Sequence, residues 1–268
     1  MTEHRPASAP PSASPRTRKR FALTGRSHKV DGRVEAARGD LADVRLADRV
    51  FAPHYAAAVQ RSATRQAPIL AAHGGPAISE ILRGESFDVL EMSHGLAWGV
   101  GGVDGTVGFV AADALDVPVA VTHVVCGAGA ALPVGSRLTA EEAATFDAST
   151  IRPLDAPAKD FVALAESLVG TPAVAAGRSS AGVDGGGLVS LVLSLTGLKV
   201  ARFVDIQQRD LGHAVADSAP ILRGDLLFTE SDVAIAVDEG HAIHVGEAGV
   251  SRVGIADLGD IVTRRRLP

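Results

Sequence analysis

Three consecutive glycines, Gly185 to Gly187, stand directly before an apolar run that extends from Leu188 to Leu195. Asp184 precedes them, and an aspartate at such a position accepts hydrogen bonds from the first amides of a helix. The run is apolar on nearly every side of a helix, which predicts a helix in the centre of a core. Because glycine adds no side chain, the first amides of this helix are predicted to be uncovered.

The composition limits the classes of protein to which this chain belongs. Its 268 residues predict two or more compact units. Hydrophobic residues make up 46% of the chain but aromatic residues only 4%, so the cores are expected to consist of Ala, Val and Leu. The formal net charge of -5 argues against general nucleic-acid binding, because such binding depends on the neutralisation of phosphates.

Cysteine and histidine usage argues against disulfide, metal and cofactor chemistry. Cys126 is the only cysteine, which excludes an intramolecular disulfide and a zinc site built from several thiolates. Its apolar neighbours predict a small buried side chain. A metal site is imaginable from Asp184, Asp232, His241 and His244, but their spacing matches no dense ligand motif. We therefore predict neither a metal nor another cofactor.

The N-terminal segment, residues 1–39, is predicted to be disordered or extended. The first 20 residues are rich in Pro, Ser, Ala and basic side chains and contain almost nothing to bury. They lack the apolar core of a secretory signal. No later stretch reaches the roughly 18 apolar residues that a transmembrane helix needs. These patterns predict a cytoplasmic protein without a transmembrane segment.

Residues 40–115 are predicted to form a small all-β unit, because short β-type runs alternate with Gly and Asp. The order of a Leu-Arg-Gly-Glu turn, a Val-Leu-Glu strand, a Trp-Gly strand and a Val-Gly-Phe-Val strand resembles bacterial SH3-like domains attached to cell-wall enzymes. This resemblance implies that Trp98 faces a peptide groove, with a half-buried position in the barrel as the alternative. Residues 116–154 are predicted to be a degenerate second SH3-like unit or a linker.

Residues 155–268 resemble the NlpC/p60-type cell-wall peptidases, which are papain-like cysteine enzymes. The matching landmarks, in order, are residues 168–172, 177–180, 182–184, Arg202, Gln207 and 222–228. The resemblance implies an α+β papain-like NlpC-type domain preceded by one or two small all-β SH3-like barrels. It also implies a substrate class, the peptidoglycan stem peptides, which such enzymes cut between D-glutamate and a diamino acid.

The catalytic positions of that family carry other residues in this chain. Active members read Asp-Cys-Ser-Gly where residues 184–187 read Asp-Gly-Gly-Gly, and Asp232 stands at the histidine position. Only His244 matches the third, orienting position. Glycine has no thiol that a helix N-terminus can activate. An aspartate with its usual pKa of about 4 is a poor general acid or base at neutral pH.

The resemblance therefore predicts a catalytically inactive homologue that binds peptidoglycan-derived or other acidic peptides. The predicted ligand contacts are Asp184, Gly186, Trp98 and Arg202, and the uncovered helix amides are expected to receive a carboxylate of the ligand. Two alternatives stay open. The chain is then either an active cysteine-type endopeptidase of the same specificity, with a nucleophile at another position, or a structural component of a larger complex.

Overall fold

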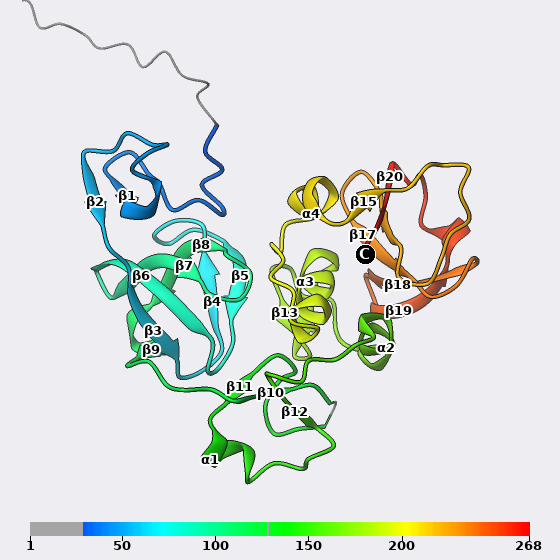
Figure 1. Ribbon diagram of the computed structural model, residues 1–268, viewed down its shortest axis with the longest axis horizontal. Coiled ribbons are helices and arrows are strands. Elements are labelled where there is room, and N and C mark those ends of the chain that lie inside the picture. The colour runs from blue at the N-terminus through cyan, green and yellow to red at the C-terminus, as the bar shows by residue number, and fades with distance from the viewer. Residues whose placement is uncertain (1–28, 128) are drawn as a thin grey trace, which may run out of the picture.

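The computed structural model describes residues 29–127 and 129–268. The part of the predicted disordered segment that precedes residue 29 lies outside the described residues. Figure 1 shows a β-rich N-terminal half beside the C-terminal half, with a smaller group of strands below and between them. Across the described ranges, no helix is long and apolar enough to cross a bilayer.

The N-terminal half is built on an antiparallel sheet of seven strands in the order β5-β4-β8-β7-β6-β3-β9, which we call the N-terminal sheet. Alternating burial along its strands places one set of apolar side chains in a core around Ile69, Phe87 and Val110. Strand β5 lies at one edge and pairs only with β4. The strands are β3 (Val59–Ala63), β4 (Ala67–Leu70), β5 (Ala77–Ile81), β6 (Ser86–Ser93), β7 (Leu96–Gly101), β8 (Val107–Ala111) and β9 (Leu115–Asp116), with a 3-10 turn η2 (Ala112–Ala114).

The chain before this sheet packs onto it. Strands β1 (Leu41–Asp43) and β2 (His54–Ala56) form a parallel pair joined through the 3-10 turn η1 (Val44–Leu46). Ala36 is only 3% exposed and packs in the same small cluster as Trp98. The prediction of a disordered or extended segment up to residue 39 is thus wrong for residues around Ala36, because they cover an apolar patch of the sheet.

Trp98 lies under this N-terminal segment rather than in an open groove. Its side chain on β7 leaves the residue 5% exposed, and the Arg38 guanidinium lies 4.4 Å above the ring. Arg38 also forms ion pairs with Asp40 and Glu91, which hold it in place. The indole is therefore a buried anchor for the segment, and the predicted position facing a peptide groove is corrected.

Residues 117–154 form a small unit of their own. Three short antiparallel strands pair in the order β11-β10-β12, and a one-turn helix follows the second of them in sequence. Thr139 and Glu142 form a capping box at the start of that helix. Val125, Leu138 and Ala143 form the core of this unit. The elements are β10 (His123–Val125), β11 (Arg137–Leu138), α1 (Ala140–Ala143) and β12 (Ile151–Pro153).

The C-terminal half packs helix α3 (Gly185–Leu195) against a six-stranded sheet. Every residue of α3 except Ser194 is buried, which confirms the predicted central helix. The sheet has the order β15-β20-β16-β17-β18-β19. Its strands are β15 (His213–Ala214), β16 (Leu226–Phe228), β17 (Val233–Ala236), β18 (His241–Gly246), β19 (Gly249–Gly254) and β20 (Thr263–Arg266), accompanied by α2 (Phe161–Ser167), α4 (Val204–Asp210), η3 (Ile255–Asp257) and the hairpin β13 (Arg178–Ser179) with β14 (Gly182–Val183).

Two arginines of the C-terminal half bind the open edge of the N-terminal sheet. Arg202 donates to the carbonyl oxygen of Ile78 at 2.5 Å, and Arg178 donates to that of Glu80 at 3.2 Å. Alternate residues of a strand direct their carbonyls to the same side, so both acceptors belong to the unpaired edge of β5. The guanidinium groups therefore satisfy an edge that otherwise exposes backbone hydrogen-bonding groups.

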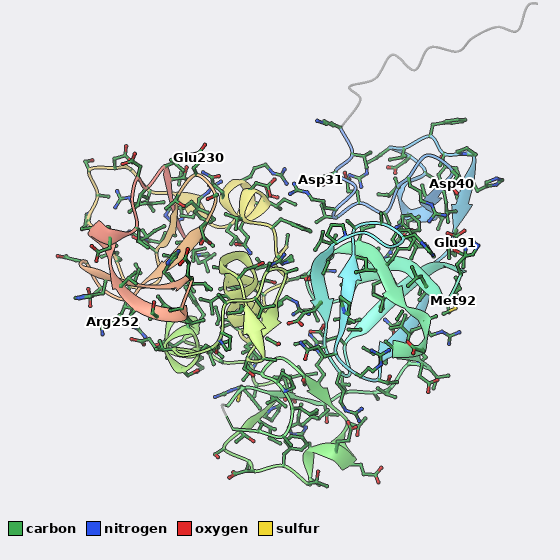
Figure 2. The ribbon with its side chains drawn as sticks, turned by 180° about the vertical axis from the view of Figure 1, so that it is seen from behind. Asp31, Asp40, Glu91, Met92, Glu230 and Arg252 are labelled. Atoms are coloured by element: carbon green, nitrogen blue, oxygen red, sulfur yellow. The ribbon has the colours of Figure 1, made fainter. Side chains whose placement is uncertain are left out.

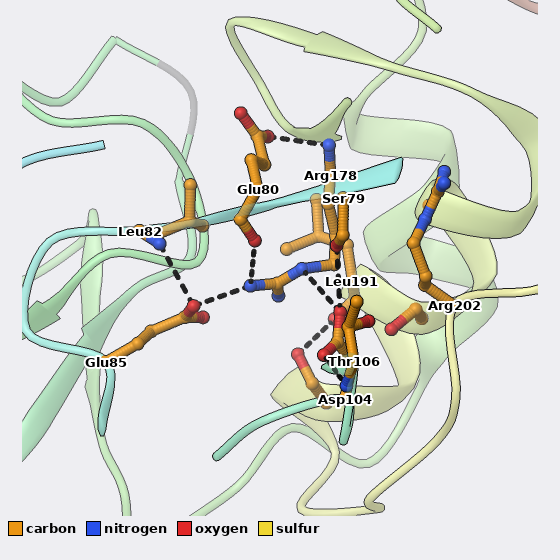
Figure 3. Close-up of polar contacts among 12 residues, drawn as sticks. Ser79, Glu80, Leu82, Glu85, Asp104, Thr106, Arg178, Leu191 and Arg202 are labelled. Carbon is orange, nitrogen blue, oxygen red and sulfur yellow. Dashed lines mark hydrogen bonds and ion pairs between the residues drawn. The ribbon is translucent and has the colours of Figure 1, made fainter. Parts of the chain in front are cut away.

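Arg178 is the centre of a buried ionic cluster at this boundary (Figure 3). It is 1% exposed, and its side chain lies 2.5 Å from Glu85 Oε2 and 3.3 Å from Asp104 Oδ2. Its backbone amide donates to Glu80 Oε1 at 2.6 Å. Burial lowers the pKa of Arg178, but the charges of Glu85 and Asp104 outweigh burial and raise that pKa above its usual value. Burial raises the pKa of Glu85 despite the attraction of Arg178.

Candidate functional site

A cleft of about 510 Å³ opens at the N-terminus of α3. Five segments form its walls: the loop before β13, the start of α3 with the residues before it, the first turns of α4 with the residues before it, the turn before β17, and β18. The lining residues are Ala173, Val174, Ala175, Val183, Asp184, Gly185, Gly186, Arg202, Phe203, Val204, Asp205, Gln208, Glu230, Ser231, Asp232 and Val245. The start of α3, with Asp184, Gly185 and Gly186, thus forms the floor of the cleft, and residues of the other segments surround it.

The Asp184 carboxylate accepts hydrogen bonds from three segments at this floor. Its Oδ1 accepts a hydrogen bond from the amide of Gly187 at 2.8 Å, which confirms the predicted N-cap. Its Oδ2 accepts from the amide of Ala176 at 2.8 Å, and Ala176 has a left-handed φ of 63°. Arg202 also donates to Oδ1, so the same guanidinium joins Asp184 to the edge strand β5. Both predicted contact residues therefore have structural partners inside the cleft wall.

Gly186 lines the same floor, and its missing side chain has a packing reason. A Cβ at this position would overlap the carbonyl oxygen of Arg202. The carbonyl of Gly186 accepts a hydrogen bond from Gln207 Nε2 at 2.8 Å, and the same Nε2 atom also donates to Ala201. The glycine therefore allows the segment before α4 to lie directly against the first turn of α3.

The structure brings Gly185, Asp232 and His244 together. A Cβ at Gly185 would overlap Oδ1 of Asp232, so the carboxylate occupies the space in which a side chain at residue 185 would begin. Oδ1 also accepts from the amide of Val233 at 2.8 Å, and Oδ2 lies 3.1 Å from His244 Nε2. The side chains of Asp232 and His244 are 33% and 24% exposed. Asp232 thus stands at the helix start with a backbone amide and an imidazole as partners.

The cleft carries an excess of negative charge. Asp184, Asp205, Glu230 and Asp232 line it, whereas Arg202 is the only Lys or Arg among the lining residues. A hydrogen bond from Arg33 lowers the pKa of Asp205 below its usual value, so this carboxyl is ionised at neutral pH. The expectation that the helix amides receive a ligand carboxylate conflicts with this charge, because two carboxylates of the chain already lie at the helix start.

Other residues considered in the sequence lie elsewhere. Trp98 is buried on the N-terminal sheet, and half-buried Cys126 lines a separate cavity beside α2. His241 pairs with Asp238 at 3.0 Å and does not join His244. In the part of the chain that the structure describes, no three His, Cys, Asp or Glu side chains lie close enough to hold a metal ion.

Sequence reasoning missed several cleft residues. Phe203, Asp205 and Glu230 line the cleft from loops and from the start of α4, and Arg33 reaches Asp205 from the N-terminal segment. Their neighbours in sequence form no recognisable motif. Their positions in the sequence were the only signal that could have found them. Phe203 and Asp205 stand close to Arg202, and Glu230 stands close to residues 222–228, which are matching landmarks of the resemblance.

Comparison with solved structures supports the fold. The crystal structure of an NlpC/P60 family protein from Bacillus cereus ATCC 10987 superposes with a TM-score of 0.61 at 15% identity, and the alignment covers 78% of this chain and all 100% of that chain. NlpC2 and NlpC1 from Trichomonas vaginalis have TM-scores of 0.44 and 0.45, each at 14% identity over 79% of this chain, covering 98% and 94% of their own chains. No protein-family model and no curated protein matches the sequence. The chain has an NlpC/P60-type fold.

Proposed function

We propose that this protein is a catalytically silent NlpC-type homologue that binds peptidoglycan-type stem peptides in the cleft at α3. One observation carries the loss of chemistry: the Asp232 carboxylate occupies the space beside Gly185 from which a cysteine side chain would extend. The thiol mechanism needs a thiolate at the helix start and an imidazole that moves a proton to the leaving amine. The chain has glycine and aspartate at these two positions.

The organisation of the chain in this proposal follows the same resemblance. Residues 40–115 are an SH3-like domain, residues 116–154 are a degenerate second unit, and residues 155–268 are the papain-like NlpC-type domain. Support comes from an apolar cluster in each of the three regions, with Val124 and Val134 of the middle region joining the cluster of the C-terminal region. The bonds from Arg178 and Arg202 to β5 then serve to hold the first domain against the wall of the cleft.

The charge of the cleft defines which end of a stem peptide it binds. Glu230 and Asp232 attract the ammonium group of the diamino acid, while a second carboxylate in this space would be repelled. The sequence alone favoured an acidic ligand group at the helix start. The stem peptide therefore contacts the cleft through its cationic group.

Binding without cleavage is the expected result when the protein is titrated with a stem tetrapeptide that contains γ-D-glutamyl-diaminopimelate. We expect calorimetric heat from the unmodified peptide and at least about tenfold weaker binding when the side-chain amine is acetylated. Asp232→Asn and Glu230→Gln should weaken binding similarly, whereas Asp113→Asn on the distant η2 turn should not. A folded protein that gives no heat, or mass spectra that show cleaved peptide, would contradict the proposal.

If Gly185 and Asp232 stand at the cysteine and histidine positions of the family, two cysteine variants should differ in activity. Gly185→Cys alone should give an alkylatable thiol but no turnover, because the group beside the new side chain is the Asp232 carboxylate and not an imidazole. Gly185→Cys combined with Asp232→His should produce slow cleavage of the γ-D-glutamyl bond, measured by mass spectrometry. Gly185→Ala with Asp232→His is the matched control without a nucleophile. Equal rates in the single and double cysteine variants would show that residue 232 does not occupy the histidine position.

A further inference from the structure

The charges of this chain are divided unevenly between its N-terminal segment and its body. Residues 1–28 contain six of the 26 Lys and Arg residues and one of the 31 Asp and Glu residues. The remaining chain therefore has 20 basic and 30 acidic residues. Four of the basic residues stand close together at Arg16, Arg18, Lys19 and Arg20. A strongly basic segment is thus joined covalently to a body with an acidic cleft.

The residues that follow this segment are already fixed to the wall of the cleft. Arg33 donates two hydrogen bonds to Asp205, at 2.9 and 2.6 Å, and its guanidinium lies 4.8 Å from the centre of the Phe203 ring. Asp205 and Phe203 both line the cleft. The carbonyl of Arg33 accepts from the amide of Val107 on the N-terminal sheet at 2.8 Å. Figure 2 shows Asp31 beside α4, at the same end of the molecule as Glu230.

Two further carboxylates that line the cleft, Glu230 and Asp232, have no arginine or lysine partner among the described residues. Within residues 29–127 and 129–268, the ion pair of Asp232 is with His244, and exposed Glu230 forms none. Asp31 stands eleven positions after Arg20 in the chain. At roughly 3.3 Å per residue, this length spans up to about 36 Å, which is ample to cross a cleft of this size. The opposite charges, the length of the connecting chain and the fixed position of Arg33 would all allow the basic segment to reach these carboxylates.

We propose that residues 1–28 bind in the acidic cleft of their own chain, with the basic run Arg16 to Arg20 against Glu230 and Asp232. The contact continues the one that Arg33 makes with Asp205. A short tether gives an effective concentration on the order of millimolar, so individually weak ion pairs suffice to populate the bound state. The consequence, which rests on the proposed function, is that this segment competes with cationic peptide ligands for the cleft.

A zero-length carbodiimide cross-link on the full chain tests the contact. Lys19 is the only lysine among residues 1–28, and the reagent joins a lysine amine to a carboxylate that touches it. We expect monomeric products in which Lys19 is joined to Glu230 or Asp232, identified by mass spectrometry. Replacing Arg16, Arg18 and Arg20 with Gln should lower the yield at least about fivefold, as should about 0.5 M NaCl, because exposed charges are screened at this ionic strength. Products at Lys159, outside the segment, are the internal reference.

Three results would overturn the proposal. They are absence of Lys19 products, equal yield at a carboxylate outside the cleft such as Asp113, or Lys19 products confined to covalent dimers, which would assign the segment to a second copy. The cross-link needs no added peptide. It can therefore fail while stem-peptide binding succeeds, and it can succeed while that binding fails. If the cross-link forms and the stem tetrapeptide also binds, the two should compete. The triple Gln variant should then bind the stem tetrapeptide at least about threefold more tightly than the natural chain.

Discussion

Replacing Arg178 with methionine should lower the free energy of unfolding by about 3–5 kcal/mol, because it leaves buried carboxylates without their cation. Glu85 lies 2.5 Å from the guanidinium and Asp104 lies 3.3 Å from it. Both carboxylates lie in turns between strands of the N-terminal sheet, whereas Arg178 belongs to the C-terminal half. The variant therefore loses the bond to the Glu80 carbonyl as well, and the two halves lose their central polar contact. Urea unfolding of the purified variant measures the loss.

Arg209→Met is the matched control for this prediction. Its side chain is 62% exposed and pairs with its neighbour Asp210, so its replacement should change stability by less than about 0.5 kcal/mol. Adding Glu85→Gln and Asp104→Asn to Arg178→Met should recover part of the loss, because the carboxylate charges are then absent. An Arg178→Met protein that is as stable as Arg209→Met would show that the buried cluster does not hold the two halves together.

Gly187→Ala should lower the free energy of unfolding by about 3 kcal/mol, because overpacking against rigid backbone has costs of this order. A Cβ at Gly187 would overlap the carbonyl oxygen of Gly177. That carbonyl also accepts from the amide of Asp184 at 3.3 Å, and Arg178 follows it in the chain. The backbone cannot withdraw without disturbing the Asp184 cap and the Arg178 cluster. Thermal and urea unfolding both measure this effect.

Gly39→Ala is the control, since a Cβ there meets no atom within 4 Å. Its stability should stay within about 0.5 kcal/mol of the natural chain. Gly185→Ala should fall between the two, because the overlapping atom is the end of the Asp232 side chain, which can rotate away from His244. If Gly187→Ala were as stable as Gly39→Ala, the first turn of α3 would not be tightly packed against the Gly177 segment.

Local patterns in the sequence predicted the elements whose causes are local. The run from Leu188 to Leu195 is apolar except for two serines, so burial of α3 followed from the run itself. Asp184 caps that helix because an aspartate before a helix start accepts amide hydrogen bonds wherever the helix packs. The NlpC/P60-type fold followed from a sequence of such landmarks, although no single one of them defines it.

Sequence reasoning did not see the surroundings that come from elsewhere in the chain. The resemblance implied a groove position for Trp98, with a half-buried position in the barrel as the alternative, and Ala36 and Arg38 pack against it. The helix start was expected to attract an acidic ligand, but Asp232 comes to it from the turn before β17, and Asp205 and Glu230 add charge from other walls. Arg178 carries no sequence sign of burial, because its carboxylate partners stand about 70 to 100 residues earlier in the chain.

The amino-acid sequence by itself determined that a buried helix begins at three glycines after a capping aspartate, and that no cysteine stands at its start. Only the tertiary structure decided what fills the space beside those glycines. Asp232, the carbonyl of Arg202 and the carbonyl of Gly177 each lie where a Cβ would be. The physical reason is that capping and hydrophobic periodicity act over a few residues, whereas excluded volume and cleft charge depend on segments that meet only in the folded chain.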